Sequence, residues 1–100
     1  MNDYTESIRQ HARLIILKAL ADQVDERLHS GLIAEELLRF GIDRPREWIH
    51  GELSWLQEMG AVQLLQAGSV MVAMLSEKGA RHLRRGLIIE GIKRPSRPGE

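Results

Sequence analysis

The sequence contains no cysteine among its 100 residues. This absence excludes disulfide bonds, zinc sites built on thiolates and a thiol nucleophile. Hydrophobic runs such as Leu14–Leu17 and Val70–Leu75 are short, far below the roughly 20 residues that a membrane-spanning helix needs. Residues 1–13 are mostly polar and lack the hydrophobic region of a secretory signal. We therefore expect a soluble cytoplasmic protein with no membrane contact.

Sequence patterns for catalysis and metal binding are missing as well. The histidines, His11, His29, His50 and His82, are scattered without the spacing of metal ligands. There is no glycine-rich phosphate loop, no nucleophile elbow and no carboxylate pair placed for acid and base roles. We expect no enzyme activity, no cofactor and no metal.

Charge is distributed unevenly, although the formal net charge is zero. Residues 22–77 contain four basic and ten acidic residues, whereas residues 78–100 contain seven basic and two acidic residues. Binding of a polyanion depends on locally clustered Lys and Arg. The C-terminal part is therefore where the charge distribution favours contact with a polyanion.

Two helices are predicted in the first 41 residues. Thr5–Ala21 has strong helix formers and neither glycine nor proline. Residues 22–29 are polar and predict a loop or a frayed helix end. Ser30 is expected to cap the second helix, and Gly41 is expected to end it.

A third helix is expected to start at Asp43 or Arg44 and to run to Met59. Pro45 suits a first helical turn, and Gly60 is a fitting end. Only three or four residues around Gly41 would then separate the second and third helices. That spacing is typical of a helix-turn-helix.

A β-hairpin is predicted after these helices. Its strands are Ala61–Gln66 and Val70–Leu75, with Ala67, Gly68 and Ser69 at the tip, where glycine adopts backbone angles that other residues resist. Helices followed by one hairpin indicate a winged helix, a mainly helical α+β fold. The expected architecture is a winged helix-turn-helix with three N-terminal helices, a two-stranded wing and a C-terminal helix.

The C-terminal part divides into a helix and a tail. Ser76 is expected to cap the fourth helix, which would extend toward Gly86. Beyond it, Leu87–Ile89 is a short apolar segment, and the basic, proline-containing end is not expected to be helical. The expected organisation is a winged-helix domain over residues 1–86 and a basic tail over residues 87–100.

Glu52 is the one charged residue on the apolar arc of the predicted third helix. A buried, unpaired carboxylate is costly, so this side chain should have a partner. Arg13 and His11 on the first helix are the candidates. We interpret the pair as structural, because no second acid or nucleophile accompanies Glu52.

The first helix is apolar on more than one side. Tyr4, Ile8, Ala12, Ile15 and Ala19 form one stripe, and further leucines lie well off it. A surface helix needs a single stripe. The helix is therefore either the central strut of the domain or part of a subunit interface, and the strut is favoured.

Several segments resemble proteins of a known family. RQHARLIILKAL, ELSWLQEMGAV, GSVMVAMLSEKG and GIKRPSRP, in this order, resemble a family of small proteins encoded by Mu-like transposable phages and prophages. The hairpin followed by SEKGARHL resembles, less specifically, winged-helix regulators of the MarR and ArsR types. The resemblance implies a winged-helix fold and a bacterial cytoplasmic setting. It transfers no functional residue.

The leading hypothesis is a phage or prophage transcriptional regulator that binds double-stranded DNA as a homodimer. Its subunits would meet through the first helix, with the C-terminal segment as a further contact. The second helix of a helix-turn-helix lies in the major groove. The expected DNA contacts are Arg44, Arg46, His50, Ser54 and Gln57 on the third helix, Gly68 and Ser69 at the wing tip, and Lys93, Arg94 and Arg97 on a flexible arm.

The alternative is a phage protein adaptor that makes no nucleic-acid contact. Two observations weigh against DNA binding: Glu47 and Glu58 share the exposed face of the third helix, and the wing tip has no Lys or Arg. The acidic surface, the apolar first helix and Leu87–Ile89 support the adaptor. A fold alone cannot decide between the two uses.

Overall fold

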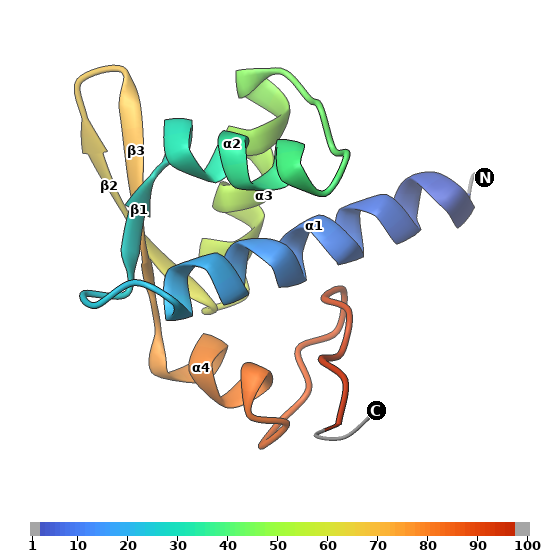
Figure 1. Ribbon diagram of the computed structural model, residues 1–100. Helices are drawn as coiled ribbons and strands as arrows, with labels where there is room; N and C mark the ends of the chain where they lie inside the picture. The colour runs from blue at the N-terminus through green and yellow to red at the C-terminus, as the bar shows by residue number, and fades with distance from the viewer. Residues whose placement is uncertain (1–2, 98–100) are drawn as a thin grey trace.

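The computed structural model describes residues 3–97 of the chain. Four helices and a three-stranded antiparallel sheet form a mainly helical α+β domain (Figure 1). The elements are α1 (Asp3–Ala21), β1 (Arg27–His29), α2 (Ser30–Arg39), α3 (Arg46–Glu58), β2 (Val62–Ala67), β3 (Val70–Leu75) and α4 (Glu77–Leu83). The predicted fold class is therefore confirmed.

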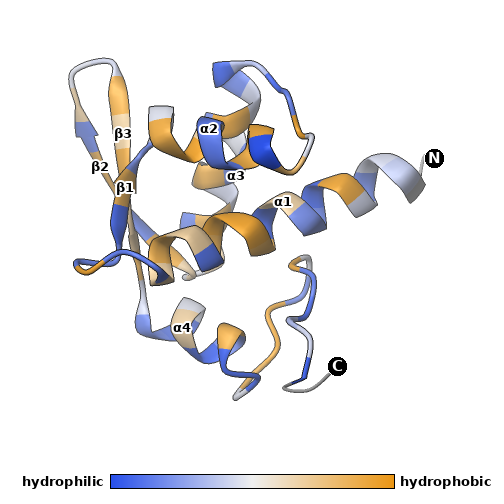
Figure 2. Cartoon of the chain, in the orientation of Figure 1, coloured by the Kyte–Doolittle hydropathy of each residue, from blue (hydrophilic) through white to orange (hydrophobic). Residues whose placement is uncertain are grey.

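Helix α1 crosses the middle of the domain and forms its central strut. Its apolar side chains from Ala12 to Leu20 are almost completely buried within this one chain. Figure 2 shows the apolar colouring on the part of α1 that lies between the other elements. Because both sides of α1 are covered by its own chain, the excess apolar surface that we noted in the sequence is used in the core.

Strand β1 corrects the prediction that residues 22–29 form only a loop. Arg27–His29 pairs with β3, and the strand order in the sheet is β1-β3-β2. Leu28 lies opposite Ala73 and packs against the core. A segment of three residues with one apolar side chain is too short to show the alternation that predicts a strand. Pairing with β3 supplies the missing stabilisation.

The cap of α2 also differs from the prediction. His29 is the N-cap, and its Nδ1 accepts hydrogen bonds from the backbone N–H groups of Gly31 and Leu32. Ser30 is the first helical residue, and its Oγ instead accepts a hydrogen bond from the Met71 N–H at 3.3 Å. The prediction that Ser30 caps α2 is therefore wrong, and its hydroxyl group joins α2 to the wing.

Helix α3 begins later than expected, at Arg46, with Pro45 as its N-cap. The connection from α2 therefore covers residues 40–45 and is longer than the three or four residues predicted. Pro45 is extended and lies outside the helix. Arg44 stays outside as well, because a residue that precedes proline avoids the helical region. The C-terminal end agrees closely, since Glu58 is the last helical residue and Met59 is the C-cap.

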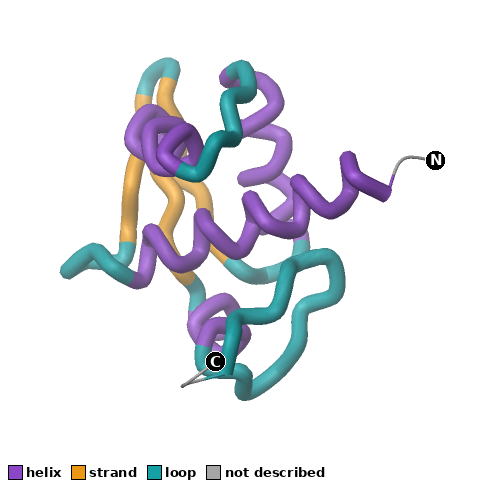
Figure 3. Tube along the Cα trace, turned by 45° about the vertical axis from the view of Figure 1, so that its right-hand side comes forward, coloured by secondary structure: helices purple, strands orange, loops and turns teal. Residues whose placement is uncertain are grey.

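Helix α4 is capped as predicted, because Ser76 Oγ accepts a hydrogen bond from the Gly79 N–H at 3.0 Å. The helix ends at Leu83 and does not reach Gly86. The following chain turns back along α1 (Figure 3).

Residues 87–97 pack against the domain. Ile89 and Ile92 are buried in the same core as α1. His82 holds the segment at both ring nitrogens: Nδ1 accepts from the Ile89 N–H at 3.1 Å, and Nε2 donates to the Lys93 carbonyl at 3.0 Å. The Lys93 N–H donates in turn to the Gln10 carbonyl on α1. This packing differs from the flexible arm expected from the sequence.

Glu52 has the partner that its burial requires. Arg13 Nε donates to Glu52 Oε1 at 2.6 Å, and the two residues are only 6% and 7% exposed. Arg13 also donates to the Gly91 carbonyl at 2.8 Å and stacks on Trp55 at 3.8 Å from the ring centroid. The predicted pairing is confirmed for Arg13, while the other candidate, His11, is exposed. One arginine thus connects α1, α3 and the C-terminal segment.

Candidate nucleic-acid interface

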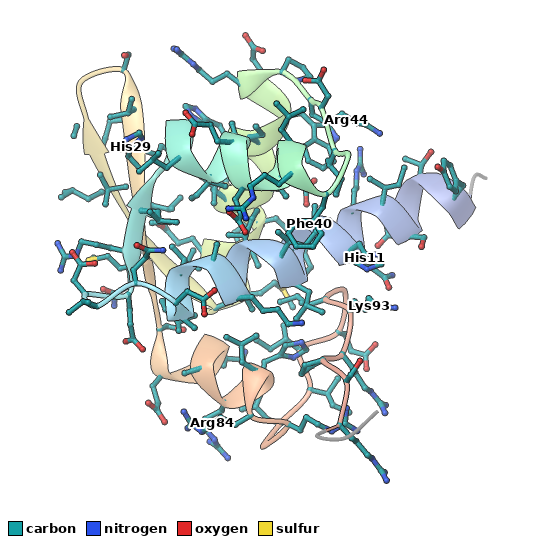
Figure 4. The ribbon with its side chains drawn as sticks, in the orientation of Figure 1. His11, His29, Phe40, Arg44, Arg84 and Lys93 are labelled. Carbon is teal, nitrogen blue, oxygen red and sulfur yellow. The ribbon has the colours of Figure 1, made fainter. Side chains whose placement is uncertain are left out.

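The outward face of α3 carries most of the side chains that the sequence predicts for DNA contact. Arg46, Ser54 and Gln57 are exposed, and His50 is half-buried. Arg44 is exposed just before the helix, with its guanidinium 5.6 Å from the centroid of the Trp48 ring (Figure 4). The opposite face buries Ile49, Leu53 and Leu56 in the core. This division presents polar groups to solvent along the length of α3.

Gln57 has a structural role that its position on the helix did not reveal. Its Oε1 accepts a hydrogen bond from the Leu64 N–H at 3.0 Å and so ties α3 to β2. One lone pair of the amide oxygen is therefore engaged within the chain, while the amide NH₂ group and the second lone pair remain for an outside partner.

The wing tip is a tight turn. Ala67 pairs with Val70, so the loop is shorter than predicted and consists of Gly68 and Ser69. Gly68 has φ +62°, as a type II′ turn requires at its first central residue. The Gly68 carbonyl accepts a hydrogen bond from Gln66 Nε2 at 2.9 Å. A phosphate contact here would depend on Ser69 Oγ and backbone N–H groups.

No charged residue occurs in residues 59–76, which include the whole wing. Any electrostatic attraction toward a phosphate must therefore come from α3 and the chain before it. Arg44 and Arg46 supply two positive charges there, and Glu47 and Glu58 supply two exposed negative charges on the same helix. Both arginines lie at the N-terminal end of α3, where the helix dipole adds to the attraction for anions, and Glu47 in the same first turn offsets part of it.

The wing tip and the N-terminal end of α3 lie on the same side of α1, as Figures 1 and 3 both show. The C-terminal segment lies on the other side of α1 in both views. Lys93 and Arg94 are exposed there, and Figure 4 places Lys93 below α1 and Arg44 above it. Arg97 is exposed in the same segment. The structure therefore groups the predicted residues of α3 and the wing but separates them from the basic residues of the tail.

A cavity of about 220 Å³ lies where α2, α3 and the wing meet. Its lining includes Gly31, Arg44, Arg46, His50 and Val70, and none of the lining residues is acidic. His50 Nε2 is buried and has no hydrogen-bond partner among the described residues. In this cavity the predicted DNA contacts Arg44, Arg46 and His50 share a lining with Val70 of the wing.

The structure is similar to that of a known DNA-binding protein. One matching structure is F93 from STIV, a winged-helix DNA-binding protein, with a TM-score of 0.58 and 27% sequence identity. It covers 72% of this chain and 78% of F93. The fold is a winged helix. No protein-family model matches the chain, and no curated protein matches it; the resemblance to proteins of Mu-like phages stays a prediction.

Two further features are absent from residues 3–97. Within that range, no three or more His, Asp or Glu side chains are grouped so that they could hold a metal ion. No helix in the same range has the length and apolar character needed to cross a membrane.

Sequence reasoning missed the residues that build the α2 side of the cavity. Ser30 was assigned to a cap, and Gly31 was given no role, yet both line the cavity beside His50. No local pattern in the sequence signals this proximity, because it depends on the pairing of β1 with β3. That pairing places the start of α2 beside Val70.

Proposed function

We propose that this winged-helix protein binds double-stranded DNA through α3 and the wing tip. The observation that carries the proposal is the N-terminal end of α3, where Arg44 and Arg46 are exposed and line the same cavity as Val70 of the wing. The likeness to a winged-helix DNA-binding protein supports it. In this fold the start of the second helix of the helix-turn-helix enters the major groove.

The proposal includes a regulatory role in a phage or prophage, within the bacterial cytoplasm. A homodimer would place two α3 surfaces on one duplex and would multiply weak contacts. The part of α1 left for such an interface is its N-terminal end, where Tyr4 is 73% exposed, with the nearby Phe40 at 62%. A hollow lined by both residues runs along α1 and could receive a second subunit.

Replacing Arg44 and Arg46 together with alanine should weaken binding to DNA at least tenfold. A hydrogen bond to a charged group contributes about 1.5–3 kcal/mol, and 1.4 kcal/mol corresponds to a factor of ten. Fluorescence anisotropy with a duplex selected from a random pool would measure the loss. The matched control replaces Arg81 and Arg84, exposed arginines on and just after α4. Equal losses in both double variants would contradict a specific role for α3.

Removing the tail charges should have a smaller effect. We leave Lys93, Arg94 and Arg97 outside the proposed α3 face, because they lie beyond α1. Changing Lys93 and Arg94 to glutamine should leave the slope of log affinity against log salt unchanged, whereas losing Arg44 and Arg46 should reduce it by about two. Measuring affinity across a salt series decides between these results. A reduction of about two from the tail variant would instead place the tail on the DNA.

A protein adaptor is the second candidate function. The exposed apolar side chains of Tyr4, Leu38 and Phe40 favour it, because they lie on α1, α2 and the loop after α2, away from the wing. Pull-down from cells, with and without nuclease, separates the two functions. Partners that survive nuclease treatment, together with no retained DNA, would favour the adaptor.

A further inference from the structure

The cavity between α2, α3 and the wing has an unusual lining. Arg44, Arg46 and His50 provide the groups that donate hydrogen bonds or carry charge, and Ala34, Ile49 and Val70 provide apolar walls. Arg46 and His50 are one helical turn apart, so both lie on the side of α3 that faces α2. Three basic residues thus line this cavity, and no carboxylate is among the lining residues.

Among the residues that line the cavity, His50 is the one with a buried polar side-chain atom, Nε2, that has no hydrogen-bond partner among residues 3–97. Buried polar atoms in folded proteins nearly always have a partner, so an exception calls for an explanation. No neighbouring group reaches it: the Gly31 N–H donates to His29, and Ser30 Oγ accepts from Met71 without bonding to His50. A water molecule or a ligand would complete the bonding of His50.

We propose that this cavity binds one phosphate group. The His50 ring turns its buried Nε2–H toward the cavity and donates to one phosphate oxygen, and the guanidinium groups of Arg46 and Arg44 supply charge and further donors. Guanidinium groups match phosphate oxygens in both geometry and charge. A phosphate has several acceptor oxygens that donors can approach from different directions. This suits Arg44 before α3, Arg46 at its first residue and His50 one turn later.

This inference deepens the proposed function: assigning the phosphate to DNA rests on the proposed DNA binding. If the phosphate belongs to a DNA backbone, Arg46 and His50 fix the position of α3 and do not read bases. Phosphate contacts set register and orientation, whereas contacts to base edges carry sequence information. Base reading would then fall to Ser54 and to the free NH₂ group of Gln57. A free phosphate is the other source of the same chemistry.

The first experiment tests the cavity without DNA. Titrating the protein with inorganic phosphate should shift the ¹⁵N resonance of His50 Nε2 in a saturable manner, with sodium chloride at equal ionic strength as the reference. Arg46→Gln should weaken this response several-fold, and Arg84→Gln should not. A response that chloride reproduces, or no response at all, would overturn the phosphate site.

The second experiment identifies the source. On several duplexes of unrelated sequence, Arg46→Gln and His50→Phe should each lower affinity by the same factor for every duplex. Arg46→Gln should also reduce the salt slope by about one. Losses confined to one sequence would show base reading and overturn the backbone assignment. If the unaltered protein binds no duplex, the proposed function fails, while the phosphate titration still decides whether the cavity holds a free phosphate.

Discussion

Replacing Glu52 with leucine is expected to lower the free energy of unfolding by about 3 kcal/mol. Removing one partner of a buried ion pair costs about 3–5 kcal/mol, because the remaining charge is left buried without its counter-charge. The lower end applies here, since Arg13 keeps its hydrogen bond to the Gly91 carbonyl, its contact with Trp55 and its ion pair with Glu6 at 3.7 Å. Urea unfolding followed by circular dichroism measures the change. The melting temperature should fall by about 12–24 °C, at about 4–8 °C per kcal/mol.

A double variant isolates the pair itself. Changing Arg13 to methionine in the Glu52→Leu background removes the buried positive charge that has lost Glu52 as its partner. At least half of the lost stability should therefore return. Glu58→Leu is the matched control, because Glu58 is exposed on the same helix, and its effect should stay within about 0.5 kcal/mol. If the double variant loses the sum of the two single losses, the residues do not interact and the structural role assigned to the pair is wrong.

The need for this ion pair was visible in the sequence, and so was the fold. Glu52 interrupts an apolar helical arc, and burial of a carboxylate requires a cation. The hairpin was also predictable, because apolar runs on both sides of Gly68 and Ser69 leave few other arrangements. These features depend on residues close in the chain or on a strong physical cost. They are the kind of information that a single sequence carries.

The cavity and the N-cap of α2 were not predictable, because both depend on contacts between distant segments. His29 accepts the first hydrogen bonds of α2 only because β1 fixes it in an extended conformation next to β3. Helix-capping preferences pointed to Ser30 instead, since serine is the commoner cap. Helical periodicity predicted that the DNA contacts proposed for α3 would be exposed. It could not predict that His50 lies near the wing.

The docking of the C-terminal segment was also hidden in the sequence. Its composition, rich in basic residues and proline, is typical of a mobile linker. Two isoleucines and a buried histidine override that tendency, because His82 binds backbone groups at Ile89 and Lys93. Gly91 fits with φ +96°, and a Cβ there would lie 2.6 Å from the Trp55 ring. Composition reports none of these contacts, which depend on the position of α1 and α3.

Replacing Ile89 and Ile92 together with alanine is therefore expected to unfold much of the protein. Each isoleucine is almost fully buried, and a buried Ile→Ala change costs about 2–5 kcal/mol. Natural domains have only about 5–15 kcal/mol of stability in total, so the double variant should be marginal at best. Thermal unfolding and near-ultraviolet circular dichroism measure the loss, and the single Ile89→Ala variant keeps the comparison quantitative if the double variant does not fold.

The control variant Ile88→Ala, in the same segment, helps to decide whether the tail is part of the core or a free basic arm. Ile88 is 50% exposed beside Ile89, so Ile88→Ala should change stability by no more than about 0.5 kcal/mol. If the double variant Ile89→Ala, Ile92→Ala is stable, residues 87–97 do not belong to the core. That result would support the flexible basic arm predicted from composition. If the double variant loses stability and Ile88→Ala does not, residues 87–97 are part of the core. Deleting the tail then cannot test DNA binding, because the deletion would remove part of the core. Charge changes at Lys93 and Arg94 then remain the valid test of its electrostatic role.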